Sequence, residues 1–419
     1  MGSMAASVKF GGSVLTTLLA LFLKGSVAAD DTLVLGVDYY PEQWPLASMP
    51  TDLRTIKEDL GATTVRVGEF MWSMLEPKFS PLNDGTRPPT FDFTYLDSVL
   101  DACEEAGLSV MLGTPTATMP AWLATAYGES VLLKGPDSPE GYAGTVPSFG
   151  GRRQYSFNSA AYLGYARRIT RAVAERYGAR SVVTHWQVDN ELGHEGSDLD
   201  FSDNSLRAWR RWLEQRYGAA AAAEEEGGRK KTEVKDDKSG TGGGGGRGGI
   251  KSGVDKMNEA WGTVFWGVTY AFFEEVPLPR WTVPGASRTT STEFRSNMSP
   301  GMLLDFRRFR RDSITAFTNA LVSELRRANV SGLVTTNAPG GSWDKALDHT
   351  DLFANMDLPA FDNYPVWGGS TSAPAASVVA LTLDTARGWR NVVPQQQQQQ
   401  QQWKESSSSS GGGSGGVGG

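Results

Sequence analysis

The chain has very little cysteine and histidine for its length. Cys103 is the one cysteine, and there are three histidines among 419 residues. One cysteine excludes an intrachain disulfide framework and any metal site built from several thiolates. Three histidines leave little material for a histidine-based site. We therefore expect no metal site and no cofactor.

An excess of positive charge is also absent. Lys and Arg total 40 against 47 Asp and Glu, which gives a formal net charge of −7. Nucleic-acid-binding proteins usually carry a basic stripe, whereas the paired arginines of this chain are scattered and typical of solvated helix faces. Such pairs begin, among other positions, at 152, 167, 210, 307 and 310. We expect no nucleic-acid partner.

A hydrophobic run long enough to span a bilayer is missing from the N-terminal region. The apolar stretch Val14–Leu23 is too short for an anchor and is followed by small residues over 25–29. This pattern predicts a signal peptide over residues 1–29, and hence a secreted or extracellular protein with no membrane partner. A plastid transit peptide is the alternative, because this segment lacks acids. Sequons at Asn297 and Asn329 are compatible with secretion.

Three stretches have compositions that do not suit a packed core. Residues 219–253 are rich in charge and glycine without periodicity, which predicts a low-complexity insertion without regular structure between two helices. Residues 281–301 are predicted to form a polar loop. Residues 395–419 are a Gln, Ser and Gly tail, expected to be disordered. The folded domain is therefore expected over residues 30–394, with a hydrophobic content for the chain of 39%.

Within that domain, short β-like runs alternate with longer helical patterns. The strand candidates are residues 32–40, 62–68, 107–113, 181–188, 331–337 and 358–365. The helix candidates are residues 49–60, 94–106, 159–177, 205–217, 258–275 and 303–328. Such alternation predicts an α/β fold with a parallel sheet and right-handed crossovers. Because no GxGxxG follows the first strand, a (β/α)₈ TIM-barrel type, incomplete at the C-terminal end, is favoured over a Rossmann sheet.

The sequence WQVDNELG, residues 186–193, places three polar residues where a buried strand would end. At the C-terminal ends of parallel barrel strands, carboxylates can point into a shared pocket. Asp189, Asn190 and Glu191 are therefore candidates for a functional site. A strand followed by an ordinary polar turn is the alternative, because Asp and Asn bond local backbone in turns.

Nine separated motifs, in order, closely resemble the β-galactosidases of glycoside hydrolase family 42. They are LGVDYYPEQWP (35–45), VRVGEFMWSMLEP (65–77), FDFTYLD (91–97), LGTPTATMPAWL (112–123), RRQYSFNSAAYL (152–163), WQVDNELGH (186–194), NEAWGTVFW (258–266), LLDFRRFRRD (303–312) and FDNYP (361–365). The resemblance covers roughly residues 33–394 and corresponds to the N-terminal part of the family's catalytic barrel. It implies retaining hydrolysis of terminal β-D-galactosyl residues of oligosaccharides or glycans, and a homo-oligomer.

The resemblance also implies roles for individual residues. Retaining hydrolysis requires two carboxyl groups about 5 Å apart, one protonating the leaving oxygen and one attacking the anomeric carbon. Glu191 corresponds to the acid/base, and Asn190 to the residue that binds the sugar's 2-hydroxyl. Arg152, Trp266 and Tyr364 correspond to sugar-site residues, although Arg152 could instead begin a surface helix and the two aromatic residues could be core.

The resemblance gives no catalytic role to two other carboxylates and no metal to this chain. We interpret Glu42 and Glu69 as pocket-rim or structural carboxylates. Some family members bind a structural zinc through four cysteines, one near RRQYSFN and three after the Asn-Glu pair. This chain has Ser156 in the first region and no cysteine in the second, so the zinc is not transferred.

The family's nucleophile has no counterpart in the recognisable sequence. In the family it is a glutamate on the seventh strand, in a stretch resembling PFWVMEQ, whereas polyglutamine follows Pro394 here. Glu405 is the one carboxylate downstream, in a tract without a β-pattern to position it. Two functions therefore stay open. The chain is a retaining β-galactosidase, or it is a catalytically inactive barrel that at most binds sugar.

Overall fold

The computed structural model describes residues 34–82, 85–135, 150–233, 251–279, 298–340, 346–364 and 376–389. The predicted signal segment 1–29 and the tail 395–419 lie outside these ranges. Most of the predicted loop 281–301 also lies outside them. Within the described ranges, no helix is both long enough and apolar enough to cross a bilayer.

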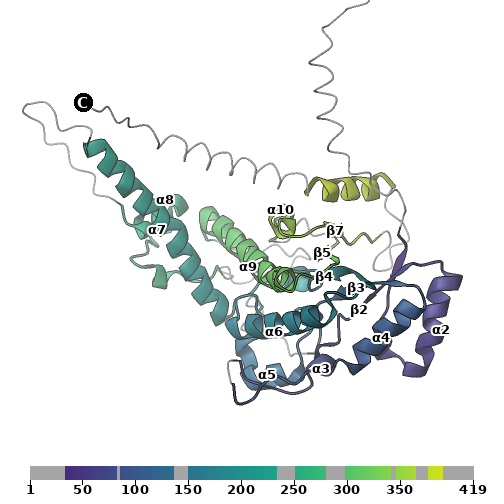
Figure 1. Cartoon of the computed structure of the whole chain (residues 1–419). Helices are drawn as coiled ribbons and strands as arrows, with labels where there is room; N and C mark the ends of the chain where they lie inside the picture. The colour runs from purple at the N-terminus through teal and green to yellow at the C-terminus, as the bar shows by residue number, and fades with distance from the viewer. Residues whose placement is uncertain are drawn as a thin grey trace, which may run out of the picture.

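The centre of the molecule is a parallel sheet whose strands follow one another in chain order (Figure 1). Its five strands are β1 (Gly36–Asp38), β2 (Thr64–Val67), β3 (Ser109–Gly113), β4 (Val183–Gln187) and β5 (Leu333–Thr335). A second, two-stranded parallel sheet consists of β6 (Asn337–Ala338) and β7 (Ala360–Phe361). Strand β6 begins two residues after the end of β5. Before Thr336 the chain pairs with β4, as strand β5, and after Thr336 it pairs with β7, as strand β6. Consecutive parallel pairing is the arrangement expected of a (β/α) barrel wall.

Helices connect these strands and cover one face of the sheet. The α-helices are α2 (Met49–Arg54), α3 (Trp72–Leu75), α4 (Thr94–Glu105), α5 (Ala121–Tyr127), α6 (Ala160–Tyr177), α7 (Asp203–Glu233), α8 (Gly253–Trp261), α9 (Pro300–Arg327) and α10 (His349–Phe353). In Figure 1, α2 and α4 lie near the β2 end of the sheet, and α7 projects away from it. Residues 376–389 are also helical.

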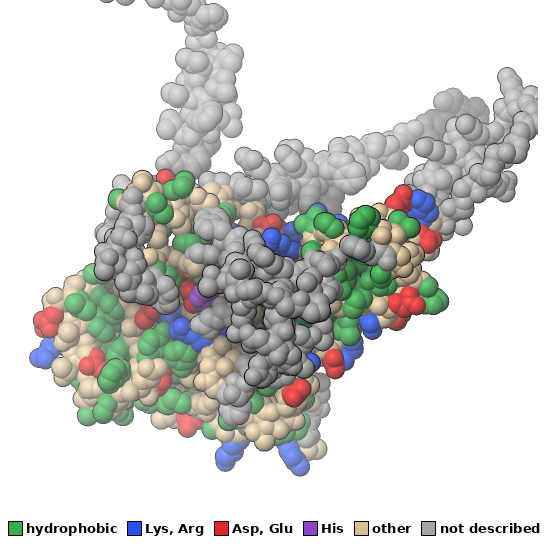
Figure 2. Space-filling model, turned by 180° about the vertical axis from the view of Figure 1, so that it is seen from behind, with side chains coloured by type: hydrophobic (Ala, Val, Ile, Leu, Met, Phe, Trp, Pro, Cys, Tyr) green, Lys and Arg blue, Asp and Glu red, His purple; other side chains and the backbone are tan. Residues whose placement is uncertain are grey.

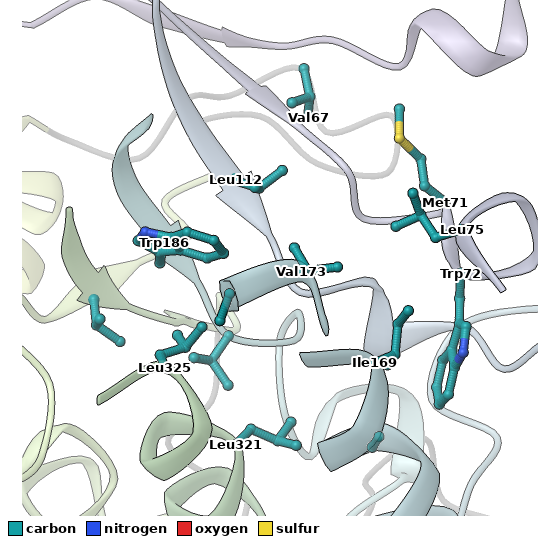
Figure 3. Packing of buried hydrophobic residues seen from close by; sticks show 14 of the residues in the cluster. Val67, Met71, Trp72, Leu75, Leu112, Ile169, Val173, Trp186, Leu321 and Leu325 are labelled. Carbon is teal, nitrogen blue, oxygen red and sulfur yellow. The ribbon is translucent and has the colours of Figure 1, made fainter. Parts of the chain in front are cut away.

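The core lies between the sheet and the helices that cover it. Figure 3 shows Val67, Leu112 and Trp186 of three neighbouring strands facing helical residues such as Val173 and Leu325. Trp186, Val67 and Leu112 are fully buried. Burial of apolar side chains of this size contributes about 1.5–3 kcal/mol each. A second cluster fills the lobe of α7 and α8, where Trp209, Trp261 and Phe306 pack together.

Strand alternation separates this core from the other face of the sheet. Successive strand side chains point to opposite faces, so the neighbours of the core residues point the other way. Arg66, Met111 and Gln187 are those neighbours, and all three line a cavity. The alternation Val-Arg-Val in β2 therefore supplies both a core face and a polar cavity wall.

Two expectations for helical structure differ from what is observed. Helix α7 continues to Glu233, through the first part of the segment 219–253 that was predicted to lack regular structure. The five alanines and the Glu, Arg and Lys residues there have high helix propensity, which outweighs the two glycines. The rest of that segment up to residue 250 lies outside the described residues.

The prediction of a single helix over residues 258–275 is also wrong in its limits. Helix α8 spans Gly253–Trp261 and ends at Gly262, whose φ of +62° is the left-handed conformation that terminates helices. Gly267 repeats this conformation with φ +67°. Short 3₁₀ segments, Thr263–Trp266 and Phe273–Glu275, replace the expected continuation.

The surface carries both signs of charge. On the face seen in Figure 2, basic and acidic side chains are interspersed with apolar and polar ones. The coloured part of this face therefore presents no continuous basic stripe. Hydrophobic side chains gather on the lobe of α7 and α8, where Val264 and Phe265 are each 80% exposed.

A buried carboxylate joins the two long helices α6 and α9. Glu324 of α9 is fully buried and accepts from Arg167 and Arg171 of α6, at 2.7 and 2.8 Å. Arg327 adds a third ion pair at 2.6 Å. Burial opposes ionisation of Glu324, but the hydrogen bonds from these three arginines outweigh it and lower its pKa to about 2.

We expect Glu324→Gln to lower the free energy of unfolding by about 2–4 kcal/mol at pH 7, because three arginines lose one buried partner. The folded-state pKa lies below the unfolded value of roughly 4.3, so the stabilisation is present above that value and lost as pH falls towards 2. Urea unfolding at several pH values measures this, with exposed Glu175→Gln on α6 as control. A difference between wild type and variant that does not shrink in acid would contradict this account.

Candidate active site

A cavity of about 490 Å³ opens beside the C-terminal ends of the strands. Its lining is mostly polar and comes from every strand of the described sheet except β5. The lining residues are Gly36, Val37, Asp38, Thr64, Arg66, Met111, Arg152, Gln187, Asn190, Glu191, Asn337, Ala360, Asp362 and Tyr364. Hydroxyl-rich ligands suit such a wall, because carboxylates, amides and guanidinium groups can each bond a hydroxyl.

The segment after β4 is held in an uncommon backbone conformation. Asp189 and Glu191 have φ values of +56° and +43°, in the left-handed region that residues with a Cβ rarely adopt. Two such residues flanking Asn190 turn the chain sharply at the strand end. Strain of this kind costs of order 1–3 kcal/mol for each residue and requires a surrounding structure that holds it.

The Asp189 carboxylate provides that structure. It is 1% exposed and accepts from Thr116 Oγ1 at 2.7 Å and Tyr155 Oη at 2.8 Å. It also accepts from the Asn190 backbone N–H at 2.8 Å. Burial raises the pKa of Asp189, and these hydrogen bonds oppose the rise. Asp189 therefore anchors the turn and leaves the next two side chains to face the cavity.

Glu191 lies between a cation and a phenol. Its Oε2 is 3.4 Å from Arg153 Nη1, and its Oε1 accepts from Tyr364 Oη at 3.3 Å. Glu191 is 5% exposed although it lines the cavity. Burial, followed by the negative charges of Asp362 and Glu191, raises the pKa of Tyr364 to about 12. The phenol therefore remains a proton donor at neutral pH.

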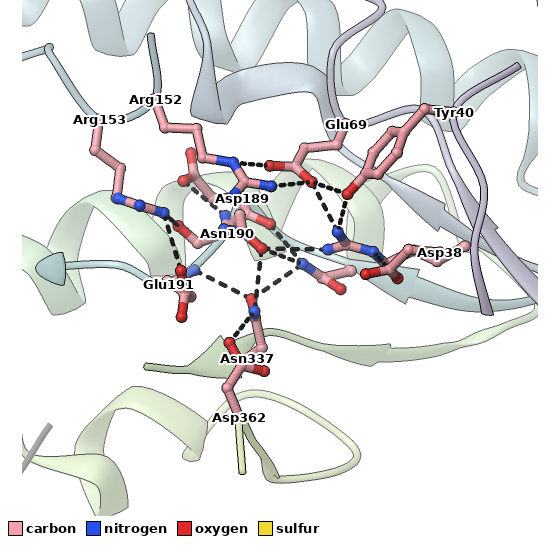
Figure 4. A network of polar contacts seen from close by, with 12 residues as sticks. Asp38, Tyr40, Glu69, Arg152, Arg153, Asp189, Asn190, Glu191, Asn337 and Asp362 are labelled. Atoms are coloured by element: carbon pink, nitrogen blue, oxygen red, sulfur yellow. Dashed lines mark hydrogen bonds and ion pairs between the residues drawn. The ribbon is translucent and has the colours of Figure 1, made fainter. Parts of the chain in front are cut away.

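A charged network forms the opposite wall (Figure 4). Arg152 donates to both oxygens of Glu69, at 2.7 and 3.1 Å. Arg66 donates to the same carboxylate at 2.7 Å, to Asp38 at 2.7 Å and to Asn190 Oδ1 at 3.2 Å. Glu69 is 2% exposed, so one buried carboxylate fixes two guanidinium groups beside the cavity.

Asn337 connects the remaining parts of the site. Its Oδ1 accepts from the Glu191 backbone N–H at 3.1 Å and from Gln187 Nε2 at 3.0 Å. Its Nδ2 donates to Asn190 Oδ1 at 3.0 Å and to Asp362 Oδ2 at 2.8 Å. A single amide thus fixes side chains from β4 and from the end of β7, as Figure 4 shows.

The residues singled out in the sequence have different outcomes. Arg152, Asn190, Glu191 and Tyr364 all line the cavity. Trp266 ends a 3₁₀ segment beside α8, and its side chain lies outside the described part of the chain, so its role stays a prediction.

Sequence reasoning missed Arg153, Arg66 and Asn337, and it named Asp362 only as an alternative nucleophile. Arg153 neighbours the predicted Arg152, but its side chain is buried and reaches Glu191. Strand alternation in β2 could have indicated Arg66, because this charged residue lies between two valines that point to the opposite face of the sheet. Asn337 carries no local signal, since it follows an ordinary apolar run, whereas Asp362 lies in the motif FDNYP.

In the region where, by resemblance, some family members bind zinc, this chain has a hydrogen-bonded cluster. The buried Asp200 carboxylate accepts from the hydroxyls of Ser156, Ser202 and Ser205. Among the described residues, no group of three or more His, Cys, Asp and Glu side chains is arranged to hold a metal ion.

Comparison with known proteins places these features in a family context. A family model described as beta-galactosidase, glycoside hydrolase family 42, matches residues 38–230 and 250–414. Beta-galactosidase BgaA of Thermus sp is 36% identical over 334 residues, which are 80% of this chain and 42% of that protein. The chain thus spans about two fifths of the length of this curated relative.

Solved structures give the same result. The crystal structure of beta-galactosidase from the psychrophilic Marinomonas ef1 matches with a TM-score of 0.61 and 33% identity, covering 80% of this chain and 41% of the other. The beta-galactosidase from Bacillus circulans sp. alkalophilus matches with a TM-score of 0.63 and 28% identity, covering 85% and 43%. These likenesses confirm the barrel type of fold predicted from the alternation of strands and helices.

The network predicts different effects for two carboxylates that share Arg66. Glu69→Gln should lower the free energy of unfolding by about 2–4 kcal/mol, because two guanidinium groups lose their buried counter-charge. Asp38→Asn should cost about 1 kcal/mol or less, because Asp38 is 58% exposed and solvent screens its ion pair. Urea denaturation of both variants tests this. Equal losses would show that burial does not determine the strength of these pairs.

Proposed function

The chain belongs to glycoside hydrolase family 42, and from this membership we propose that its cavity binds and hydrolyses terminal β-D-galactosyl residues with retention of configuration. The nine motifs found in the sequence are the basis of the prediction, and the family match covers them. The single observation that carries the proposal is the turn after β4, which presents Asn190 and Glu191 to a polar cavity.

In this proposal Glu191 is the acid/base. A carboxyl group in a nearly dry site can hold a proton, give it to the glycosidic oxygen, and later take one from water. Tyr364 and Arg153 contact its two oxygens and fix the orientation of the carboxyl group. Asn190, whose Oδ1 accepts from Arg66 and Asn337, keeps its Nδ2 for the sugar's 2-hydroxyl.

Arg152 is proposed to bind sugar hydroxyls. Its guanidinium is fixed by both oxygens of Glu69, yet the side chain is still 32% exposed at the cavity. A guanidinium fork has five donors, so two bonds to Glu69 leave others for a ligand. Trp266 is proposed as an aromatic wall on the basis of the NEAWGTVFW motif alone.

A carboxylate nucleophile is required opposite Glu191. Of the described carboxylates in this network, Asp38 and Glu69 are ion-paired with arginine, and Asp362 accepts from Asn337. These contacts favour a second candidate function, binding of galactosides without hydrolysis, for which the same cavity and the same sugar contacts suffice.

We expect Glu191→Gln to lower hydrolysis of lactose by roughly 10²–10⁴-fold, because a poor leaving group depends on general-acid help. Aryl β-galactosides with good leaving groups should lose less in the first chemical step, and azide should restore part of their turnover. Steady-state kinetics of the full chain measures this, with surface Glu104→Gln as the matched control.

The contrary outcomes are distinct. Lactose hydrolysis that survives Glu191→Gln would exclude Glu191 as the acid. Galactose binding by calorimetry without turnover of either substrate would favour the binding function. Turnover that disappears in Glu405→Gln would identify Glu405 as the nucleophile.

We also propose secretion, from the predicted signal peptide over residues 1–29. Asn329, in the sequon Asn-Val-Ser, is exposed after the end of α9, where a glycan would meet no packed neighbour. A fluorescent reporter fused after residue 40 should enter the secretory pathway of a plant or algal host. Accumulation in plastids would support the transit-peptide alternative instead.

A further inference from the structure

Two carboxyl groups meet on the wall of the cavity that β4 and β7 form. Asp362 follows β7 directly and Glu191 follows β4, and both line the cavity. Asn337 joins them, because its Nδ2 donates to Asp362 Oδ2 at 2.8 Å while its Oδ1 accepts from the Glu191 N–H at 3.1 Å. Tyr364, two residues after Asp362, donates to Glu191.

In the part of the chain that the structure describes, the cations near this pair do not balance both negative charges. Arg153 is 3.4 Å from Glu191, and Arg66 acts on Asp362 only through its charge. Arg66 is already bonded to Asp38 and Glu69, and Arg152 to Glu69. Tyr364 is neutral. Two carboxylates at close range in a partly dry site oppose each other's ionisation.

We propose that Asp362 is a positioning residue that shares one proton with Glu191 and so keeps the acid/base supplied with a proton up to near-neutral pH. The naming of Glu191 as acid/base rests on the proposed function. The sharing of a proton between the two carboxyl groups rests on their place on one cavity wall and on the hydrogen bonds of Asn337 and Tyr364 that join their segments.

The titration of Asp362 supports this assignment. Burial, followed by the hydrogen bond to Glu191 and the charge of Glu191, raises the pKa of Asp362 to about 7. The bond from Asn337 and the charge of Arg66 act in the opposite direction but are weaker. Asp in an unfolded chain has a pKa of about 3.9. Between roughly pH 4 and 7 the folded chain therefore holds a proton here that the unfolded chain releases.

The proton balance of catalysis follows. When the glycosidic C–O bond breaks, the pair gives its proton to the leaving oxygen, and the aglycone departs as an alcohol while a carboxylate nucleophile bonds to the anomeric carbon. Both carboxyl groups of the pair are then ionised, which favours their taking a proton back from the attacking water in the second step. The pair returns to its one-proton state with no net change.

The test reads the proton directly and needs no turnover. The full chain, carrying ¹³C-labelled Asp and Glu side chains, is titrated by NMR from pH 4 to 9 in four forms. These are wild type, Asp362→Asn, Glu191→Gln, and Asp384→Asn as a control in which an exposed surface carboxylate is removed.

The wild type and Asp384→Asn should show a carboxyl transition near pH 7. Asp362→Asn should lack it, and in Glu191→Gln it should move to lower pH by about one unit or more, because Asp362 no longer faces a negative charge. Absence of any carboxyl transition above about pH 5.5 in the wild type would overturn the proposal. Persistence of the transition in Asp362→Asn would also overturn it.

A pH profile separates this proposal from the proposed function. If the full chain hydrolyses an aryl β-galactoside, the basic limb of kcat/KM should move down by about one pH unit or more in Asp362→Asn, with a small change at pH 5. A purely structural role would lower kcat/KM equally at all pH values and would contradict proton sharing. Absence of hydrolysis in the wild type would count against the proposed function only, since the NMR titration still decides the pairing.

Discussion

The candidate site depends on the buried carboxylate of Asp189. Three hydrogen bonds to this group hold the chain at positive φ on both sides of Asn190. Without them the segment would relax towards extended or right-handed backbone, and Asn190 and Glu191 would turn away from the cavity. Two of these bonds come from Thr116 and Tyr155, which lie 73 and 34 residues before Asp189, so the turn depends on segments distant in the sequence. The hydrogen bonds offset the cost of burying this charge, and the turn that they hold fixes two side chains.

Arginine pairing determines the electrostatics of the cavity around that turn. Glu69 holds Arg66 and Arg152, and Arg66 in turn holds Asn190. On the β2 side, Asp38 and Glu69 thus balance the two guanidinium groups, whereas Glu191 and Asp362 lie on the β4 and β7 side, where Arg153 pairs with Glu191. Under the proposed function, a neutral sugar lies between these two walls, with hydroxyl donors facing carboxylates and hydroxyl acceptors facing guanidinium groups.

Much of this arrangement could be predicted from the sequence, for reasons that differ between residues. The strands and the helices α4, α6 and α9 follow from hydrophobic periodicity, and the observed limits differ from the predicted ones by a few residues. Glu191 and Asn190 were found because a strand end and a family motif coincide there. The role of Asn337 and its bond to Asp362 could not be predicted, because they arise from pairing between β6 and β7. The predicted length of helix α7 is too short, because the composition of the segment after residue 218 is typical of low complexity. Alanine and charged residues of high helix propensity nevertheless extend a helix that has already started.

The cluster around Asp200 illustrates how side-chain chemistry can change while the chain path is kept. In some members of the family that this sequence resembles, a zinc ion and four cysteines hold this region together. Here Ser156 lies before α6, Ser202 and Ser205 lie at the start of α7, and all three hydroxyls donate to the Asp200 carboxylate. The Lys134 backbone N–H donates to the same carboxylate at 3.1 Å. Hydrogen bonds to a charged group contribute about 1.5–3 kcal/mol each, so four of them can tie these segments together without a metal. Because the segment 192–205 begins directly after Glu191, this cluster fixes the far end of the loop whose near end Asp189 holds.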